Sequence, residues 1–484
     1  MQYAASFFVI SGMKRIILFF IFIGITKIQA QHNLPKPTAQ QLAWHDMEFY
    51  LFMHFGPNTF TDLEWGHGNE KEEVFNPVNL DCDQWCRIAQ QAGAKGIIIT
   101  AKHHDGFCLW PSRYSKHTVK ESKWKNGKGD VLKDLSAACK KYGLKFGVYI
   151  SPWDRNHPDY GTEKYNEVFV NMMEELFTNY GPVWELWWDG ANGEGPNGKK
   201  QVYDWHRFRE TVKKLSPHTV VFSDVGPHIR WVGNENGIAG ETNWNYLDTA
   251  GFTAGAAAPT TEILNTGNIN GKAWIPAECD VSIRPGWFYH KAEDDKVKNP
   301  EQLFNLYLKS VGRGTNLLLN VPPDGRGLIH ENDSAALVGF KKLKDANFKN
   351  KFPFDVISFT SNRRFRYSKK LYDANDKTFV RIKGHDENRI KLYCKTGALI
   401  NCIILKEFIK KGQKIFKAKI EYSGWEDSGT FSEVRSVSTI GRERVITFPA
   451  INAKYIFITI TDSKGTPMIS EVAAYLIDEK LIEK

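Results

Sequence analysis

The sequence predicts an α/β fold, a (β/α)8 barrel of the TIM type followed by an all-β sandwich domain. Its 484 residues fit a barrel-sized unit plus an accessory domain. From about residue 45 to 345, short apolar segments alternate with segments of helical period. Near residue 350 the helical period fades. We therefore expect a signal peptide over 1–30, the barrel over 31–348 and the sandwich over 349–484.

Composition excludes several classes of protein. Hydrophobic residues make up 42% and charged residues 25%, which is typical of a globular chain and not of a disordered, collagen-like or multi-span membrane protein. The formal net charge is +9, but no run of five or more Lys or Arg residues occurs. Nucleic acid is therefore not an expected partner.

The N-terminus has the pattern of an export signal. Basic Lys14 and Arg15 precede an apolar run over 16–25, and the small residue Ala30 stands before Gln31. The run is too short to span a bilayer, although a membrane anchor is the alternative interpretation. We expect an exported chain, periplasmic or secreted, with no stable membrane span.

The cysteines do not indicate a metal site. Seven remain after the export signal, an odd number, and no two are spaced as CxxC. We interpret most of them as small buried apolar residues and expect no metal and no cofactor.

The clearest helix–strand unit of the barrel runs from Asp130 to Ile150. Asp130 can cap the start of a helix, Gly143 can end it in a left-handed turn, and a strand over 144–150 follows at once. The same order recurs along the chain. The expected strands are 50–54, 96–100, 144–150, 184–189, 219–224, 273–278 and 315–320.

One part of the barrel is harder to assign. The stretch 226–270 is the least regular, so distorted elements are expected there. A doubly wound open sheet is the alternative fold, but no Gly-rich phosphate loop follows the first strand. Beyond residue 350, alternating segments such as 417–422 and 455–461 are separated by turn residues and predict the sandwich.

Polar residues follow several of the expected strands, where catalytic groups of a barrel collect. The residues are His54, His103, His104, Asp105, Asp189, Asp224 and Glu278. Adjacent side chains on an extended backbone point in opposite directions, so His103 and His104 do not chelate one metal together. Hydrogen bonds to hydroxyl groups suit these histidines better, and two buried structural histidines are the alternative.

Asp189 is the candidate nucleophile of a glycosidase. It follows Trp187 and Trp188 and precedes Gly190, which places a carboxylate on an aromatic-walled turn. The alternative is a helix-capping Asp. A glycosidase also needs a second carboxyl group across the scissile bond. The candidates are Glu235, Glu241 and Glu278, and spacing does not choose among them.

At these positions the sequence resembles the α-L-fucosidases of glycoside hydrolase family 29. The similar segments follow the family order between residues 54 and 323. They are His54–Gly56, Glu64–Gly66, Thr100–Phe107, Tyr149–Trp153, Leu186–Gly190 and Leu317–Pro323.

The resemblance implies a retaining exo-fucosidase that needs no metal. Asp189 matches the family nucleophile, and Trp287 the aromatic residue that packs on the apolar side of the sugar. Trp187 belongs to the same segment as the nucleophile and is expected to bind substrate. The positions that hold the fucose ring are matched by His54, Glu64, Trp65, His103, His104 and Tyr149.

The segment Trp231–Glu235 resembles the family branch that acts on α-1,3/1,4-linked fucose, and it implies that Glu235 is the acid/base. The expected partners are therefore fucosylated, Lewis-type glycans. The alternatives are another exo-glycosidase or a non-catalytic glycan-binding protein on the same barrel. The C-terminal segment resembles the galactose-binding, discoidin-like sandwich, through 371–374 and 453–472.

Overall fold

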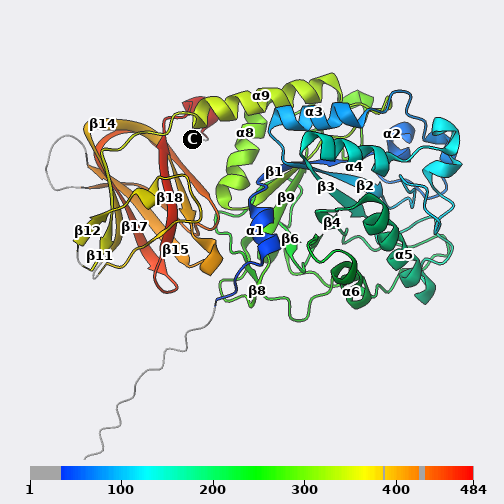
Figure 1. The fold of residues 1–484 in the computed structure, drawn as a ribbon, viewed down its shortest axis with the longest axis horizontal. Coiled ribbons are helices and arrows are strands. Elements are labelled where there is room, and N and C mark those ends of the chain that lie inside the picture. Colours follow the sequence, from blue (N-terminus) through cyan, green and yellow to red (C-terminus); the bar gives the residue numbers. More distant parts are fainter. Residues whose placement is uncertain (1–33, 363, 385–386, 424–430, 483–484) are drawn as a thin grey trace, which may run out of the picture. The chain divides into compact units, whose positions relative to one another are not determined.

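The computed structural model describes residues 34–362, 364–384, 387–423 and 431–482. The expected signal peptide lies outside the described residues. From Leu34 onward the chain forms one compact unit, in which a barrel and a β domain follow one another along the sequence (Figure 1). None of the described helices is both long enough and apolar enough to cross a membrane.

Eight parallel strands close the barrel, as the sequence predicts. Their order around it is β1-β10-β9-β6-β5-β4-β3-β2. The strands are β1 (Phe49–Met53), β2 (Gly96–Lys102), β3 (Lys145–Ile150), β4 (Glu185–Trp187), β5 (Val220–Ser223), β6 (Ile229–Trp231), β9 (Ala277–Ser282) and β10 (Asn316–Asn320).

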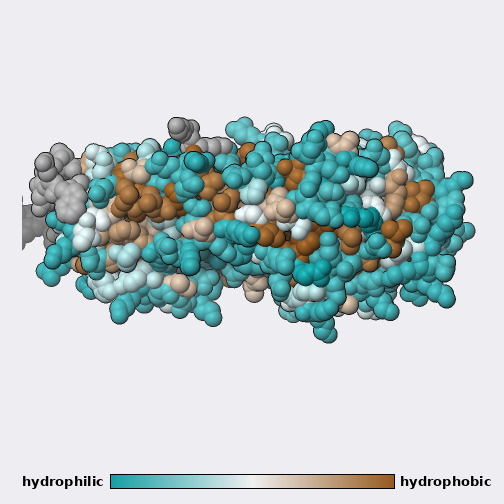
Figure 2. All heavy atoms as spheres, turned by 90° about the horizontal axis from the view of Figure 1, so that it is seen from above, coloured by the Kyte–Doolittle hydropathy of each residue, from teal (hydrophilic) through white to brown (hydrophobic). Residues whose placement is uncertain are grey.

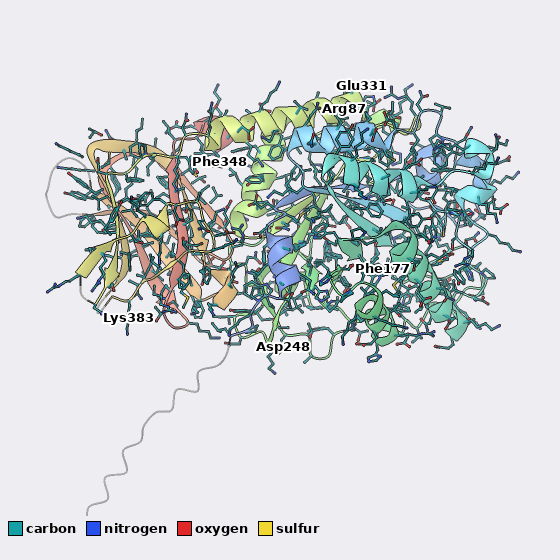
Figure 3. The ribbon with its side chains drawn as sticks, viewed as in Figure 1. Arg87, Phe177, Asp248, Glu331, Phe348 and Lys383 are labelled. Atoms are coloured by element: carbon teal, nitrogen blue, oxygen red, sulfur yellow. The ribbon has the colours of Figure 1, made fainter. Side chains whose placement is uncertain are left out.

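Helices surround the strands (Figure 1). The predicted caps of one helix are confirmed: the Asp130 carboxylate accepts the amide of Lys133 at 3.0 Å, and Gly143 ends the helix with φ of 68°. Figure 3 labels Arg87 and Phe177 on two of the helices. The described α-helices are α1 (Ala39–His45), α2 (Pro57–Thr61), α3 (Cys82–Ala92), α4 (Val131–Tyr142), α5 (Glu163–Tyr180), α6 (Trp205–Leu215), α7 (Thr261–Thr266), α8 (Pro300–Lys309) and α9 (Glu331–Phe348).

One expected strand is wrong in its bounds. The segment 273–278 is divided by Pro276, which has no amide hydrogen to donate to a strand ladder. Ala273 and Trp274 form β8, which pairs with β7 (Tyr246–Leu247) outside the barrel. The barrel strand β9 begins only at Ala277 and continues to Ser282. Glu278 therefore lies near the start of its strand rather than at its end.

Alternation along the strands separates two apolar layers. On β1, Leu51 packs in the large cluster between strands and helices, whereas Tyr50 and Phe52 pack inside the barrel. Successive side chains of a strand point to opposite faces, so residues two apart share the interior. The interior cluster consists mainly of Trp44, Tyr50, Phe52, Ile98, Tyr149, Trp187, Phe222 and Leu318.

The β domain is a separate antiparallel sheet with a core of its own, rich in isoleucine. Its long strands β14 and β17 pair with each other over most of their length. The strands are β11 (Val356–Ser361), β12 (Arg364–Tyr367), β13 (Val380–Arg381), β14 (Asn388–Glu407), β15 (Ile415–Ser423), β16 (Ser432–Val437), β17 (Arg444–Ser463) and β18 (Met468–Tyr475).

Buried polar groups join the barrel to the β domain. The amide oxygen of Gln413 accepts the backbone N–H of Asn245 at 2.8 Å, and its nitrogen donates to the carbonyl of Asn243 at 3.1 Å. The Tyr246 hydroxyl donates to the Gln413 carbonyl at 2.7 Å. Gln413 is fully buried, so these bonds satisfy polar atoms that water does not reach.

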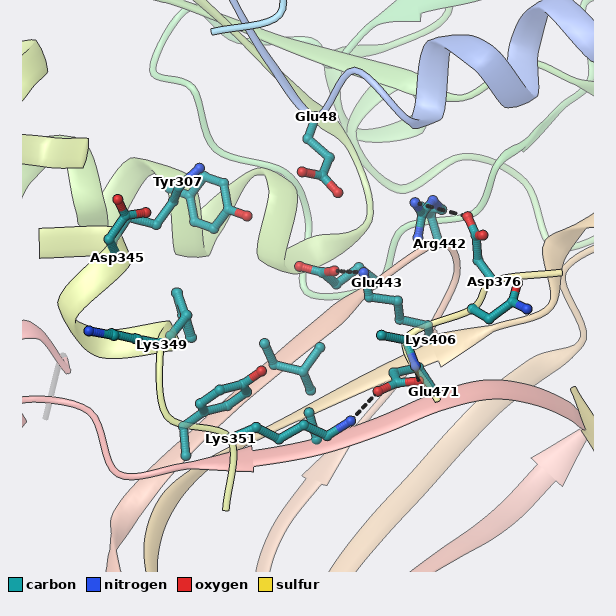
Figure 4. Close-up of a pocket in the computed structure, with 17 residues that line it drawn as sticks. Glu48, Tyr307, Asp345, Lys349, Lys351, Asp376, Lys406, Arg442, Glu443 and Glu471 are labelled. Carbon is teal, nitrogen blue, oxygen red and sulfur yellow. Dashed lines mark hydrogen bonds and ion pairs between the residues drawn. The ribbon is translucent and has the colours of Figure 1, made fainter. Parts of the chain in front are cut away.

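A cleft of about 870 Å³ lies along the same contact (Figure 4). Ion pairs line it, among them Lys406 with Glu443 at 2.6 Å and Arg442 with Asp376 at 3.7 Å. None of the site residues expected from the sequence lines this cleft. The face in Figure 2 is mostly hydrophilic, with hydrophobic residues in separate groups.

Candidate active site

The ten site residues expected from the sequence line one cavity of about 210 Å³ at the carboxyl ends of the barrel strands. Phe52, Ala191 and Asp280 complete its lining. The ten residues are His54, Glu64, Trp65, His103, His104, Tyr149, Trp187, Asp189, Glu235 and Trp287.

Asp189 is held by hydrogen bonds at both of its oxygens. Oδ1 accepts the backbone N–H of Ala191 at 2.7 Å, and Oδ2 accepts the Tyr149 hydroxyl at 3.0 Å. Burial raises the pKa of Tyr149 well above its usual range, so this hydroxyl remains a donor. Asp189 lies two residues after Trp187 and therefore shares its interior face. A carboxylate fixed in this way is suited to attack a bound sugar.

Tyr149 is part of an aromatic stack with Trp187 and Phe222. The Trp187 ring lies 3.9 Å from Phe222, centroid to centroid, and 5.4 Å from Tyr149, stacked on both. The Trp187 indole N–H donates to Glu278 Oε1 at 2.9 Å. The position of Asp189 thus depends on packing inside the barrel as well as on its own turn.

His54 is oriented by Asn320 at the end of β10. Nδ1 of His54 lies 2.8 Å from Asn320 Oδ1, while the Asn320 nitrogen donates to the Trp287 carbonyl at 2.7 Å. An amide oxygen only accepts, so Nδ1 carries the proton and Nε2 is left as an acceptor. Burial lowers the pKa of His54 to about 4, which keeps the ring neutral near pH 7.

The two adjacent histidines are also buried and neutral. Burial lowers the pKa of His104 to about 4 and that of His103 well below its usual range. His104 Nδ1 lies 2.8 Å from Ser151 Oγ, and the Nδ1 atom of His103 has no partner among the described residues. Neutral imidazoles both donate to and accept from hydroxyl groups. Within the described chain, no three His, Cys, Asp or Glu residues are placed to hold a metal ion.

Glu64 fixes the segment that carries Trp287. Its two oxygens accept the backbone N–H groups of Trp287 at 2.8 Å and of Phe288 at 3.1 Å. His290 Nε2 lies 2.7 Å from Glu64 Oε1. The Trp287 ring packs 5.1 Å from His54, and Trp65, which is 54% exposed, stands edge-on to His104 at 5.5 Å.

Glu235 meets the cavity from the loop that follows β6. Its Oε2 accepts the indole N–H of Trp287 at 3.1 Å, and the side chain is exposed. Trp287 therefore contacts the cavity with its ring and Glu235 with its indole nitrogen. An exposed carboxyl group at the cavity can exchange protons with water.

The other two carboxyl candidates do not line the cavity. Glu241 forms ion pairs with Arg313 of the barrel and with Arg444 of the β domain. Glu278 is fully buried beneath the cavity, where Tyr50, Trp44 and Trp187 donate to it. The shifted start of β9 is the reason, because it moves Glu278 one layer deeper than the sequence suggests.

Three site residues were missed by the sequence analysis. Asn320 lies within the segment Leu317–Pro323 that resembles the family, but only the structure shows that it orients His54. His290 lies beyond the expected strands, so its contact with Glu64 has no local signal. Asp280 stands two residues after Glu278, and a correct end for β9 would have placed it on the interior face at the cavity.

Comparison with models of protein families shows to which family the chain belongs. The family model described as "Alpha-L-fucosidase" matches residues 31–343. The chain belongs to the alpha-L-fucosidase family. It is similar to Alpha-L-fucosidase 1 of Arabidopsis thaliana, with 38% identity over 96% of this chain and 94% of that protein. Alpha-L-fucosidase activity is thus shown at the level of the family, which separates the chain from the other exo-glycosidases considered.

Solved structures have the same architecture. A glycoside hydrolase 29 family member from an unknown rumen bacterium matches 92% of this chain and 78% of its own length, with 39% identity and a TM-score of 0.83. A Ruminococcus gnavus GH29 fucosidase, solved in complex with fucose, matches 93% of this chain and 96% of its own length. Its identity is 30% and its TM-score 0.83.

The lowered pKa of His54 predicts a pH dependence of stability. Between pH 6.5 and about 4 the unfolded chain binds a proton at this histidine that the folded chain does not, so stability falls as the pH falls through this range. His54→Asn should reduce the loss of thermal stability between the two ends of the range. His206→Asn, at an exposed histidine, is the matched control. An unchanged loss in His54→Asn would contradict a neutral buried His54.

Proposed function

We propose that the chain is a retaining exo-α-L-fucosidase that releases α-1,3/1,4-linked L-fucose from branched, Lewis-type glycans. The observation that carries the proposal is that Asp189 and Glu235, from two different parts of the barrel, line the same small cavity. The volume of about 210 Å³ suits one sugar residue at a chain end, which supports exo action.

Asp189 is the proposed nucleophile. Its carboxylate attacks the anomeric carbon of the fucosyl residue while the Glu235 carboxyl group donates its proton to the leaving oxygen. The fixed contacts of Asp189 with Ala191 and Tyr149 support this role, because they hold both carboxylate oxygens in place. A covalent fucosyl-enzyme results, and the glycosidic bond is broken with the leaving sugar released as an alcohol.

Glu235 acts twice in this scheme. After the leaving sugar departs, its carboxylate removes a proton from a water molecule, which attacks the same carbon and releases fucose with net retention. The exposure of Glu235 supports the second step, since water reaches it. Trp287 holds the side chain through one hydrogen bond to Oε2, and no described residue forms a hydrogen bond with the other oxygen.

Neutral histidines are the proposed partners of the fucose hydroxyls. His54, His103 and His104 surround the cavity and remain uncharged at neutral pH, so they can bind hydroxyl groups without drawing in anions. Trp287 and Phe52 supply the apolar wall on which the methyl side of fucose would pack.

The linkage preference and the export of the chain are parts of the same proposal. The loop from Trp231 to Glu235 follows β6 directly and supports the α-1,3/1,4 branch through its sequence. The basic and apolar pattern of residues 14–30 supports export to the periplasm or beyond. Fucosylated oligosaccharides and glycoconjugates are the proposed substrates, with no nucleic acid partner.

A panel of three substrates tests the proposed preference for α-1,3/1,4-linked fucose. We expect fucose release from a Lewis-type trisaccharide and little or none from an α-1,2-fucosylated oligosaccharide or from p-nitrophenyl α-L-fucoside. The measurement is the rate of L-fucose release at equal substrate concentration. Equal release from all three would show a broad fucosidase and contradict the proposed preference.

Substitution of the two carboxyl residues tests the mechanism. Asp189→Ala should reduce turnover by at least about 1,000-fold, because it removes the nucleophile. Glu235→Ala should lose activity on glycans, while added azide should restore turnover of an activated fucosyl fluoride by attacking the fucosyl-enzyme. Glu241→Ala is the matched control and should keep its activity. Wild-type turnover in Asp189→Ala would contradict the mechanism.

A further inference from the structure

Asp280 is a carboxyl group at the cavity that the proposed mechanism does not use. It lies on β9, two residues after Glu278, and points with it toward the barrel interior. Its side chain lines the same cavity as Asp189 and Glu235, and only 4% of the residue is exposed. Its Oδ1 accepts the indole N–H of Trp231 at 2.9 Å.

Asp280 has no positively charged partner in the part of the chain that the structure describes. Among the described residues, no lysine, arginine or histidine forms an ion pair with it, and the titratable groups that face it are the carboxyl groups of Glu235 and Glu278. A buried carboxylate without a counter-ion is costly, so the neutral acid is favoured. Burial first, and then these two carboxyl groups, raise the pKa of Asp280 well above its usual range, against the smaller opposing effect of the Trp231 N–H.

A neutral carboxyl group at this position is a hydrogen bond donor. Trp231 satisfies one acceptor oxygen, but an indole N–H cannot accept the acid proton. Apart from Trp231, no other side chain of the described residues forms a hydrogen bond with Asp280. Because the side chain lines the cavity, its O–H group can donate to an oxygen of a ligand bound there.

We propose that Asp280 is a further substrate-binding residue, a neutral carboxylic acid that donates a hydrogen bond to an oxygen of the sugar in the cavity. The inference rests on the proposed function only in that a fucosyl residue occupies this cavity. The position beside Trp231, which leads into the loop of Glu235, places the donor on the acid/base side of the sugar. Asp280 donates the bond without giving up its proton.

Two substitutions separate a neutral donor from a charged or structural residue. Asp280→Asn keeps a donor of the same shape and cannot ionise, and should keep the Kd for L-fucose and the kcat/KM for an activated fucosyl fluoride within about threefold. Asp280→Leu keeps the size and removes the donor. It should raise the Kd and lower kcat/KM by about 10- to 100-fold, the range expected when a buried polar partner is lost.

The pH dependence of fucose binding gives a second measurement. In the natural chain the Kd for L-fucose, measured by calorimetry, should rise in the alkaline range as Asp280 ionises. In Asp280→Asn it should stay constant there. This comparison uses only the conservative variant, so it stands even if Asp280→Leu does not fold.

Trp231→Phe is the control for a purely structural role. It removes the hydrogen bond from the Trp231 indole to Asp280 and leaves the carboxyl group in place. If Asp280 acted only by holding Trp231, Trp231→Phe would weaken fucose binding as much as Asp280→Leu does. The proposal predicts a smaller effect of Trp231→Phe.

Three results would overturn the proposal. They are a wild-type Kd for L-fucose in Asp280→Leu, an equal loss of fucose binding in Asp280→Asn and Asp280→Leu, or a Kd that still rises in the alkaline range in Asp280→Asn. A failure of the proposed function looks different. It would appear as intact Lewis-type trisaccharide or as full activity of Asp189→Ala, whereas the Kd for L-fucose is measured without cleavage of any linkage.

Discussion

The alternation of side chains along eight parallel strands is the constraint on which the site depends. Residues two apart on a strand share the barrel interior, so a packed residue below is followed by a polar residue at the cavity above. Phe52 is followed by His54, Trp187 by Asp189 and Glu278 by Asp280. The packed residues also contact one another, because Trp187 stacks on Phe222 and its indole N–H donates to Glu278. These contacts fix the positions of the polar residues that follow them at the cavity.

Low charge is the second feature of the site. The histidines are buried and neutral, and Asp280 and Glu278 are carboxyl groups whose pKa values burial raises. Asp189 accepts hydrogen bonds at both of its oxygens, whereas Glu235 is exposed. This arrangement suits an uncharged substrate with many hydroxyl groups, and it gives the two proposed catalytic carboxyl groups different surroundings, as acid/base and nucleophilic roles require.

Much of this arrangement follows from local sequence. The caps at Asp130 and Gly143 and the apolar strand at 144–150 are local patterns, and the structure confirms them. The ten site residues meet in one cavity because most stand on or just after strands that the sequence already indicates. Glu235 is the instructive case: its loop is irregular, so the resemblance to the fucosidases, and not periodicity, singled it out.

The site residues that the sequence analysis misplaced or missed depend on contacts that no local sequence pattern encodes. Pro276 delays β9 by four residues, so Glu278 lies inside the barrel and Asp280, which the sequence analysis did not single out, reaches the cavity. Asn320 and His290 act on His54 and Glu64 across long stretches of chain, so only the closed barrel brings each pair together.

The central claim is that Asp189 forms a covalent bond to fucose in this cavity. The most direct measurement is mass spectrometry of peptides from the chain after incubation with 2-deoxy-2-fluoro-α-L-fucosyl fluoride, which slows the hydrolysis of a fucosyl-enzyme. The account predicts one added fluorofucosyl group, located on Asp189, and none in Asp189→Ala. A label on Asp224, Glu235 or Asp280, or a natural chain that turns the compound over with no labelled peptide, would contradict it.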